Sequence, residues 1–211
     1  MTLSLTARCP ETGQLGIAIS SSSMAVGSRC PWLLPGVGAV SSQNITLPSL
    51  GPQILSALEA GASVEQALKQ ALAEDRFREY RQVAAIDANG DTAVFSGEFT
   101  LGIGGALAGD NCVAAGNMLA GQGVIAAMVG AFEAATGELA SRLLAGTVRA
   151  QSVAKAETQR TAEATTQSTY TSLDDRDRLL GQIWGLSNEE MVRAKVLLEG
   201  VTMQGQRESR F

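Results

Sequence analysis

Two short runs at the start of the chain alternate between apolar side chains and small or polar ones. The alternation covers Thr2–Ala7 and, after a turn over Pro10–Gly13, Leu15–Ser20. A period of two is typical of β-strands with one buried face, so these runs predict a β-hairpin. The second face of this hairpin permits close approach of another layer or of a ligand, because its side chains are all small or polar. These residues are Thr2, Ser4, Thr6, Gly16, Ala18 and Ser20.

The rest of residues 1–146 predicts a mixed body of strands and helices. Asn89-Gly90 is a strong hairpin signal, and Ser63 with Gln66 forms a capping box at a helix start. The glycine-rich stretch 99–109 predicts a loop or an edge strand. Strands are expected over 36–42, 81–87, 92–96 and 112–117; helices over 51–60, 63–74 and 124–146, with a break or kink near Gly137; and a loop between Pro31 and Pro35.

The composition changes near Gly146, after which glycine nearly vanishes. Residues 147–171 are rich in Gln, Thr, Ser and Ala without a clear apolar period, which predicts a polar linker or an irregular segment. Capping signals and an apolar stripe predict a helical hairpin and a polar tail over 172–211. The domain prediction is an α+β body over 1–146, the polar segment 147–171, and a C-terminal helical appendage over 172–211.

The chain of 211 residues contains no histidine. This excludes Ser-His-Asp and Cys-His catalysis, histidine metal sites and imidazole pH switching. With 16 basic and 21 acidic residues the net charge is −5, which argues against a nucleic-acid surface. Any catalysis therefore needs another base that titrates near neutral pH.

The cysteines and the apolar segments predict a soluble, cytoplasmic protein. Cys9, Cys30 and Cys112 lie far apart without metal-ligand spacing, so we expect no zinc site. No signal peptide is evident, and the most apolar stretch, 123–132, is too short to span a membrane. The run 102–107 departs from the dinucleotide fingerprint, because Leu107 stands in the place of the third glycine. We expect no metal, no cofactor, no nucleic acid and no membrane partner.

A histidine-free hydrolase remains possible if its nucleophile is the first residue of the mature chain. Thr2 follows Met1, which is readily removed before a small residue. The free α-amino group of Thr2 would then have an unperturbed pKa of about 7.7–8.0, and it would accept the hydroxyl proton. The sequence thus predicts Thr2 as a candidate catalytic nucleophile at the head of a strand.

Several short motifs, in order along residues 1–146, resemble the Ntn-hydrolase-like family known as domain of unknown function 1028. They are Met1–Ala18, Ser20–Ser23, Cys30-Pro31-Trp32, Gly36–Asn44, Tyr80–Val83 and Ala115–Gly121.

The resemblance implies a proteasome-β-like fold, a four-layer αββα sandwich with two antiparallel sheets between helix layers. It implies Thr2 as the nucleophile in a cleft at the start of the first strand, with backbone groups near Ser42-Gln43 and Gly116-Asn117 donating an oxyanion hole. Ser21 and Ser22 either line this cleft or form a plain loop. Asn117 either orients an amide substrate or ties a strand-to-helix turn. The predicted function is an amide or peptide-bond hydrolase acting on a small amide substrate.

The alternative is a catalytically silent assembly subunit. Proteasome-type enzymes place a lysine near the threonine, whereas the first lysine of this chain is Lys69. In this alternative, residues 172–211 dock a protein partner or a second copy of the chain as a homo-oligomer.

Overall fold

The computed structural model describes the backbone of residues 1–169 and the side chains of residues 1–161. Residues 1–158 form one compact unit, and the packing below is that of this unit. The strands are β1 (Thr2–Arg8), β2 (Leu15–Ser21), β3 (Pro31–Leu34), β4 (Gly38–Asn44), β5 (Arg81–Asp87), β6 (Thr92–Ser96), β7 (Ile103–Gly109) and β8 (Cys112–Leu119). The α-helices are α1 (Leu50–Glu59), α2 (Val64–Ala73), α3 (Gly123–Ala134) and α4 (Leu139–Thr169), and short 3₁₀ turns cover Val26–Ser28 and Arg78–Tyr80.

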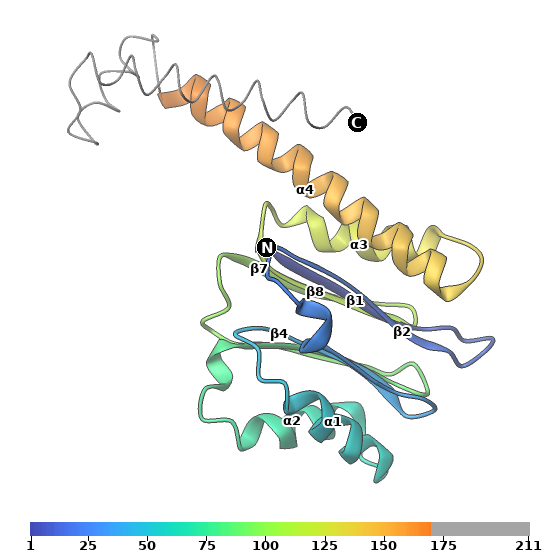
Figure 1. The fold of residues 1–211 in the computed structure, drawn as a ribbon. Helices are drawn as coiled ribbons and strands as arrows, with labels where there is room; N and C mark the ends of the chain where they lie inside the picture. The colour runs from blue at the N-terminus through green and yellow to red at the C-terminus, as the bar shows by residue number, and fades with distance from the viewer. Residues whose placement is uncertain (170–211) are drawn as a thin grey trace. The chain divides into compact units, whose positions relative to one another are not determined.

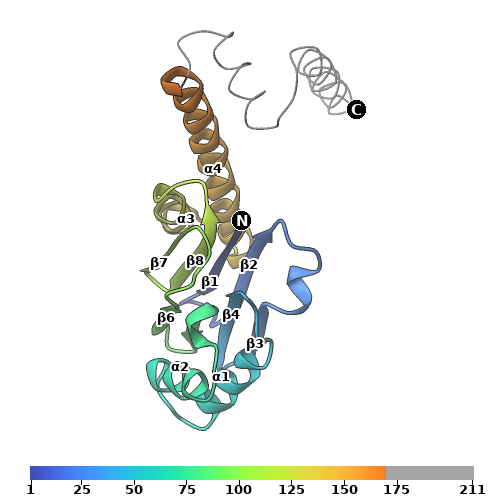
Figure 2. The same cartoon turned by 90° about the vertical axis from the view of Figure 1, so that its left-hand side faces the viewer.

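The strands form two four-stranded antiparallel sheets. Sheet A has the order β2-β1-β8-β7, and sheet B has the order β3-β4-β5-β6. The sheets lie face to face, with α1 and α2 packed against the outside of sheet B. On the outside of sheet A lie α3 and the first part of α4 (Figures 1 and 2). The observed layer order in residues 1–158 is helix, sheet, sheet, helix.

The alternation along β1 explains how sheet A divides its side chains between two neighbours. Leu3 and Leu5 point outward into the core under α3 and α4, and both are fully buried. Ser4 and Thr6 point inward toward sheet B and are equally buried. The same division holds in β8, where Cys112 joins the outer core and the odd-numbered neighbours face inward. The predicted small-residue face of the first hairpin is divided between the two sides of sheet A. Thr2, Ser4 and Thr6 face sheet B, whereas Gly16, Ala18 and Ser20 pair with Ala7, Leu5 and Leu3 and lie on the outer face.

Local signals located several elements correctly. The predicted strands 81–87 and 92–96 are β5 and β6. The capping box at α2 is formed, with Gln66 N–H donating to Ser63 Oγ at 3.3 Å and Ser63 N–H donating to Gln66 Oε1 at 3.1 Å. The stretch 99–109 contains the edge strand β7. The expected loop between Pro31 and Pro35 is instead strand β3, where proline is tolerated because β3 lies at a sheet edge.

Residues 147–169, which belong to the segment predicted to be polar or irregular, are helical, because α4 continues through Thr169. The chain does break near Gly137, which has φ +97° and separates α3 from α4. After Gly146 the helix still packs against the core, through the buried side chains of Ala150 and Ala154. Because these side chains are small, they did not produce a clear apolar period in the sequence. The second predicted part, 172–211, lies outside the described residues.

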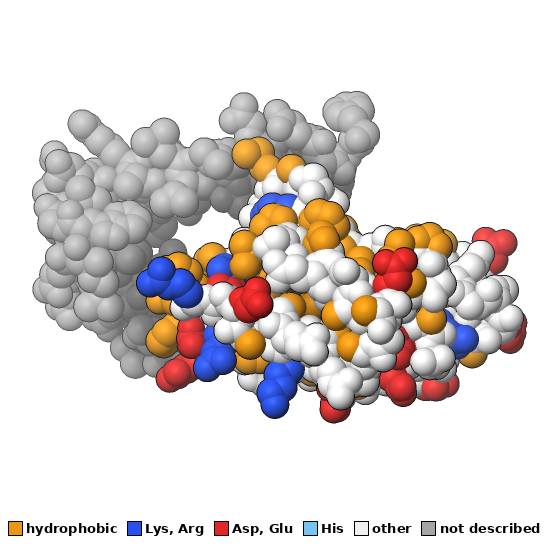
Figure 3. Space-filling view, turned by 90° about the horizontal axis from the view of Figure 1, so that it is seen from below, with side chains coloured by type: hydrophobic (Ala, Val, Ile, Leu, Met, Phe, Trp, Pro, Cys, Tyr) orange, Lys and Arg blue, Asp and Glu red, His pale blue; other side chains and the backbone are white. Residues whose placement is uncertain are grey.

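Over residues 1–169, no helix is both long and apolar enough to cross a membrane. Within the same range, no group of three His, Cys, Asp or Glu side chains is placed to hold a metal ion. On the face drawn in Figure 3, basic side chains lie in separate groups between acidic and apolar ones.

Candidate functional site

Thr2 is the first residue of β1 and lies between two polar cross-strand partners. It is opposite Ser21 of β2 on one side and opposite Asn117 of β8 on the other. Directly opposed residues share a face of an antiparallel sheet, so these three form one row facing sheet B. We call Ser21, Thr2 and Asn117 the sheet A row. Within it, Thr2 Oγ1 and Ser21 Oγ are 2.9 Å apart and share a hydrogen bond.

A second row faces the first from sheet B. Gln82 of β5 lies opposite Gln43 of β4 and opposite Ser96 of β6. Gln43 Nε2 donates to Gln82 Oε1 at 2.8 Å, and Gln82 Nε2 donates to Ser96 Oγ at 3.1 Å. We call Gln43, Gln82 and Ser96 the sheet B row. Both rows stand at the same end of the sandwich, where β1 and β5 begin and β4 and β8 end.

Gln82 connects the two rows. Its Oε1 accepts a hydrogen bond from Asn117 Nδ2 at 3.1 Å, and its Nε2 donates to the Gly116 carbonyl oxygen at 2.9 Å. Sequence reasoning gave Gln82 no role. The available signal was a polar residue at an inward position next to the apolar run Val83–Ile86. A buried glutamine at such a position needs partners for its amide, and here it finds them on both sheets.

One predicted site residue, Ser42, lies apart from the two rows. The Ser42 side chain donates to the Leu47 carbonyl oxygen at 3.3 Å, and the Ser42 N–H donates to the Cys30 carbonyl oxygen at 2.9 Å. Ser42 lies two residues after Val40 in β4, so both side chains point to the same face of the strand. Val40 packs against the helices outside sheet B. Ser42 therefore lies on the outer face, and its N–H is already committed to Cys30 rather than free to bind an oxyanion.

Gly116 contributes its carbonyl oxygen to this region, as the acceptor for Gln82. A Cβ at this position would lie 2.7 Å from Leu119 Cδ2 and 2.9 Å from Ile125 Cδ1. Glycine is needed here because α3 approaches the outer face of β8 closely. The observed roles of Gly116 are close packing and acceptance of a hydrogen bond from Gln82.

The serine run at the end of β2 forms hydrogen bonds with the first residues of the chain. The Met1 ammonium donates to Ser22 Oγ at 3.2 Å, and the Ser22 N–H donates to the Met1 carbonyl oxygen at 3.1 Å. The Ser23 N–H donates to Ser21 Oγ at 3.0 Å. Ser21 and Ser22 thus both lie beside the residues that start β1, and Thr2 itself is 8% exposed.

The side chains of both rows are uncharged, and the buried arginine next to Gln82 in β5 is paired with a carboxylate. Arg81, at the start of β5, donates from Nε to Asp75 Oδ2 at 2.7 Å and from Nη1 to the Ile45 carbonyl oxygen at 2.7 Å. The hydrogen bond from Arg81 holds the pKa of Asp75 below its usual value. In the loop between β2 and β3, Arg29 has a buried Nη1 without a hydrogen-bond partner among the described residues.

Exposed apolar side chains lie on the loops and strand ends at this end of the sandwich. Asn44 holds these loops together, because its Nδ2 donates to the Tyr80 carbonyl oxygen at 2.6 Å and its Oδ1 accepts from the Leu101 N–H at 3.2 Å. The rings of Tyr80 and Phe99 pack with centroids 4.9 Å apart. We call the exposed set the apolar rim. Its members are Tyr80, Phe99, Leu101, Ile103 and Met118, each between 40% and 48% exposed.

Comparison with known families gives a single assignment. Residues 2–172 match a family described as a family of unknown function (DUF1028). The match covers most of the chain and extends beyond residue 146, where the sequence resemblance was expected to stop. The chain belongs to this family.

A solved structure supports the same assignment. The crystal structure of a DUF1028 protein from Silicibacter pomeroyi is similar to this chain, with 33% sequence identity and a TM-score of 0.71. The similarity covers 72% of this chain and 68% of that one. No curated protein matches the chain.

Proposed function

We propose that this protein is an amide hydrolase that uses Thr2 as an N-terminal nucleophile, on an Ntn-hydrolase-like sandwich. The observation that carries the proposal is the placement of Thr2. It opens the first strand with its hydroxyl 2.9 Å from Ser21 Oγ, and it faces a second sheet in which Gln43 and Gln82 supply neutral amide groups. The helix, sheet, sheet, helix order of the layers supports the proposed fold type.

The proposed chemistry begins when the residues before Thr2 have been removed. The α-amino group, with an unperturbed pKa of about 7.7–8.0, accepts the proton of Thr2 Oγ1 as this oxygen attacks the amide carbonyl carbon. The C–N bond breaks as the proton passes to the leaving nitrogen, which leaves an ester on Thr2. Water adds to the ester, the acid is released and the Thr2 hydroxyl re-forms. Ser21 orients the Thr2 hydroxyl through their shared hydrogen bond.

The surroundings favour a small substrate whose reacting part is neutral. The rows offer amide and hydroxyl groups, which pair with an amide bond without desolvating a charge. The apolar rim at the same end suits a substrate with an apolar group next to that amide. Removal of Met1 would leave Ser22 without the partners that it has now, close to the new amino group.

The first test is the intact mass of the natural protein, which tells whether Thr2 is the first residue. The second is acylation by a β-lactone, an electrophile that forms a stable ester with an activated threonine. We expect one adduct, located on Thr2 by peptide mass spectrometry, and loss of labelling by about 10³-fold or more in Thr2→Ala. Thr12→Ala, in the exposed β1–β2 turn, is the matched control and should label normally. A native chain that retains Met1, or labelling unchanged in Thr2→Ala, would contradict the proposal.

A catalytically silent subunit is the second candidate, and the apolar rim favours it. Exposed apolar side chains gathered at one end of a domain are typical of a surface that binds another protein. In this case the protein that retains Met1 would be the functional form. Replacing Phe99 and Leu101 by serine would then remove a protein partner or lower the oligomeric state, measured by light scattering, while β-lactone labelling would be absent in every variant. The proposed helical docking segment, 172–211, lies outside the described residues.

A further inference from the structure

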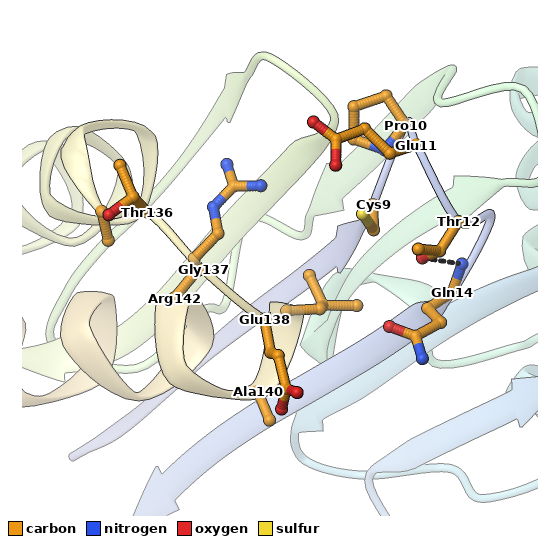
Figure 4. A pocket seen from close by; sticks show the side chains of 12 residues that line it. Cys9, Pro10, Glu11, Thr12, Gln14, Thr136, Gly137, Glu138, Ala140 and Arg142 are labelled. Atoms are coloured by element: carbon orange, nitrogen blue, oxygen red, sulfur yellow. Dashed lines mark hydrogen bonds between the residues drawn. The ribbon is translucent and has the colours of Figure 1, made fainter.

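A cleft of about 750 Å³ lies at the end of β1 away from Thr2. One wall is the β1–β2 turn, with Cys9, Glu11 and Gln14, and the other is the α3–α4 loop with the first turn of α4 (Figure 4). The seven residues of β1 separate this cleft from Thr2 by about 20 Å along the strand. The volume lies in the range of small-molecule sites, about 300–1,000 Å³.

Arg142 supplies a cation to this cleft from the first turns of α4. Its guanidinium carbon lies 4.3 Å from the centroid of the Phe132 ring, and this stacking fixes the side chain against the core. Its Nε is buried and has no hydrogen-bond partner among the described residues. A guanidinium presents donors in a fork that matches a carboxylate, and a buried donor without a partner is costly. The stacking therefore holds the arginine in place, and a ligand in the cleft would meet its terminal Nη atoms rather than the buried Nε (Figure 4).

The first turn of α4 adds to the attraction for an anionic group. The helix begins at Leu139, which lines the cleft, and the backbone N–H groups of a first turn have no partners within the helix. These groups carry a partial positive charge. Together with Arg142 they favour a carboxylate on the helix wall.

Two carboxylates in the lining oppose a purely anionic ligand. Glu11 extends from the turn toward the side of Arg142, and no ion pair joins them (Figure 4). Glu138 lines the cleft immediately before α4. A ligand with only a carboxylate would meet these like charges, and a ligand with only an ammonium would meet Arg142. A ligand that carries both groups satisfies both walls.

We propose that this cleft binds a small zwitterion, a short peptide with free ends, with its carboxylate on Arg142 and the first turn of α4 and its ammonium on Glu11. The proposal is independent of Thr2, because neither wall includes a residue of the two rows. It assigns a binding role to the end of the sandwich that the proposed catalysis does not use.

Cys9 provides a direct reporter of occupancy. It lines the cleft and is partly exposed, whereas Cys30 and Cys112, the other two cysteines of the chain, are buried. A hydrogen bond with Thr12 lowers the pKa of the Cys9 thiol, which favours its reactive thiolate. Alkylation by iodoacetamide, followed by intact mass, will therefore mark this cleft first.

The test measures Cys9 alkylation and calorimetric binding with three probes of equal length. Trialanine carries both charges, N-acetyl-trialanine only the carboxylate, and trialanine amide only the ammonium. We expect trialanine to slow alkylation saturably and to bind about tenfold or more tightly than either capped form, since each cap removes one charge-assisted contact. Trialanine recovered intact at the end excludes turnover as the cause. Equal binding of all three probes, or no saturable protection by trialanine, would overturn the proposal.

Variants separate the two walls. Arg142→Gln should weaken trialanine binding about tenfold or more and leave the amide probe unaffected, while Glu11→Gln should weaken trialanine and spare the N-acetyl probe. Glu11 is exposed in a turn, so its replacement keeps the test valid if Arg142→Gln fails to fold. Arg149→Gln, an exposed arginine farther along α4, is the matched control and should bind normally. Tight binding of N-acetyl-trialanine alone would show an anion site instead and contradict the zwitterion assignment.

Discussion

The inner and outer faces of the two sheets are held by different forces. The outer faces bury large apolar side chains against helices, as Leu5 does beneath α3 and α4. The inner faces bring together mostly small side chains and hydrogen-bonded amides, with a small apolar cluster of Ala84, Val113 and Ala115 against which Ala106 packs. Outer-face stability therefore depends on the apolar area buried, whereas inner-face stability depends on each polar group having a partner.

The largest expected difference concerns two thiols in different surroundings. Burial, with the nearby Glu133 carboxylate, raises the pKa of Cys112 to about 11, whereas the pKa of Cys9 lies below its usual 9.0. The reactive thiolate fraction falls tenfold for each unit of pH below the pKa, so near pH 7 Cys9 should react about 100-fold or more faster. Site-resolved alkylation rates between pH 6 and pH 9 measure this ratio. Equal rates at the two thiols would mean that the outer core near Cys112 opens readily.

Phe132→Ala tests the outer face by volume. Phe132 is fully buried in the outer core of sheet A, and its truncation should lower the free energy of unfolding by about 3–5 kcal/mol. Chemical denaturation provides the measurement. Phe99→Ala is the control, because that ring is 48% exposed, and its cost should be far smaller. Similar losses for both would contradict an outer core that depends on buried area.

Gln82→Leu tests the inner face by hydrogen bonding at nearly constant volume. It leaves the amide donors of Gln43 and Asn117 without their acceptor, at a cost of about 1–3 kcal/mol for a buried unpaired group. Gln70→Leu, on the exposed side of α2, should leave stability nearly unchanged. The free energy of unfolding of each variant is measured against that of the wild type. A Gln82→Leu protein as stable as the wild type would mean that the amides bridging the sheets contribute little to stability.

The smallest expected effect separates two buried serines of the inner faces. Ser4 and Ser41 are both fully buried, but Ser41 Oγ donates to Gln43 Oε1 at 3.3 Å whereas Ser4 Oγ has no partner among the described residues. Ser41→Ala should cost about 0.5–1.5 kcal/mol, and Ser4→Ala should be neutral or stabilise by up to about 1 kcal/mol. A cost for Ser4→Ala as large as that for Ser41→Ala would show that a buried water pairs with Ser4.

The sequence predicted local structure well where a single signal sufficed. The alternation in β1 identified both its strand and the unusual polarity of its inner face, and Asn89-Gly90 located the β5–β6 hairpin. Prediction of the site was less complete. Thr2, Ser21 and Asn117 do lie in one row, but this alignment depends on strand register, which local patterns leave open.

The features that the sequence did not predict all depend on contacts between distant segments. Gln82 matters because β8 lies opposite it, a relation set by sheet stacking. Ser42 faces outward because it lies two residues from Val40 in β4, and Val40 packs against the outer helices. The length of α4 was missed because Ala150 and Ala154 pack as core residues although the segment is polar on average. Each of these facts depends on a neighbour that is remote in sequence.

The double acceptor role of Gln82 Oε1 has a mechanical consequence. This oxygen accepts one hydrogen bond from Gln43 in its own sheet and another from Asn117 in the opposite sheet, so Gln82 links the two sheets mechanically. A slip of one sheet over the other by a single residue, about 3.3 Å, exceeds the reach of these hydrogen bonds. The sandwich therefore resists shear in an all-or-none manner at this end. The alignment of Thr2 with the amides below it is correspondingly either fully kept or lost at once.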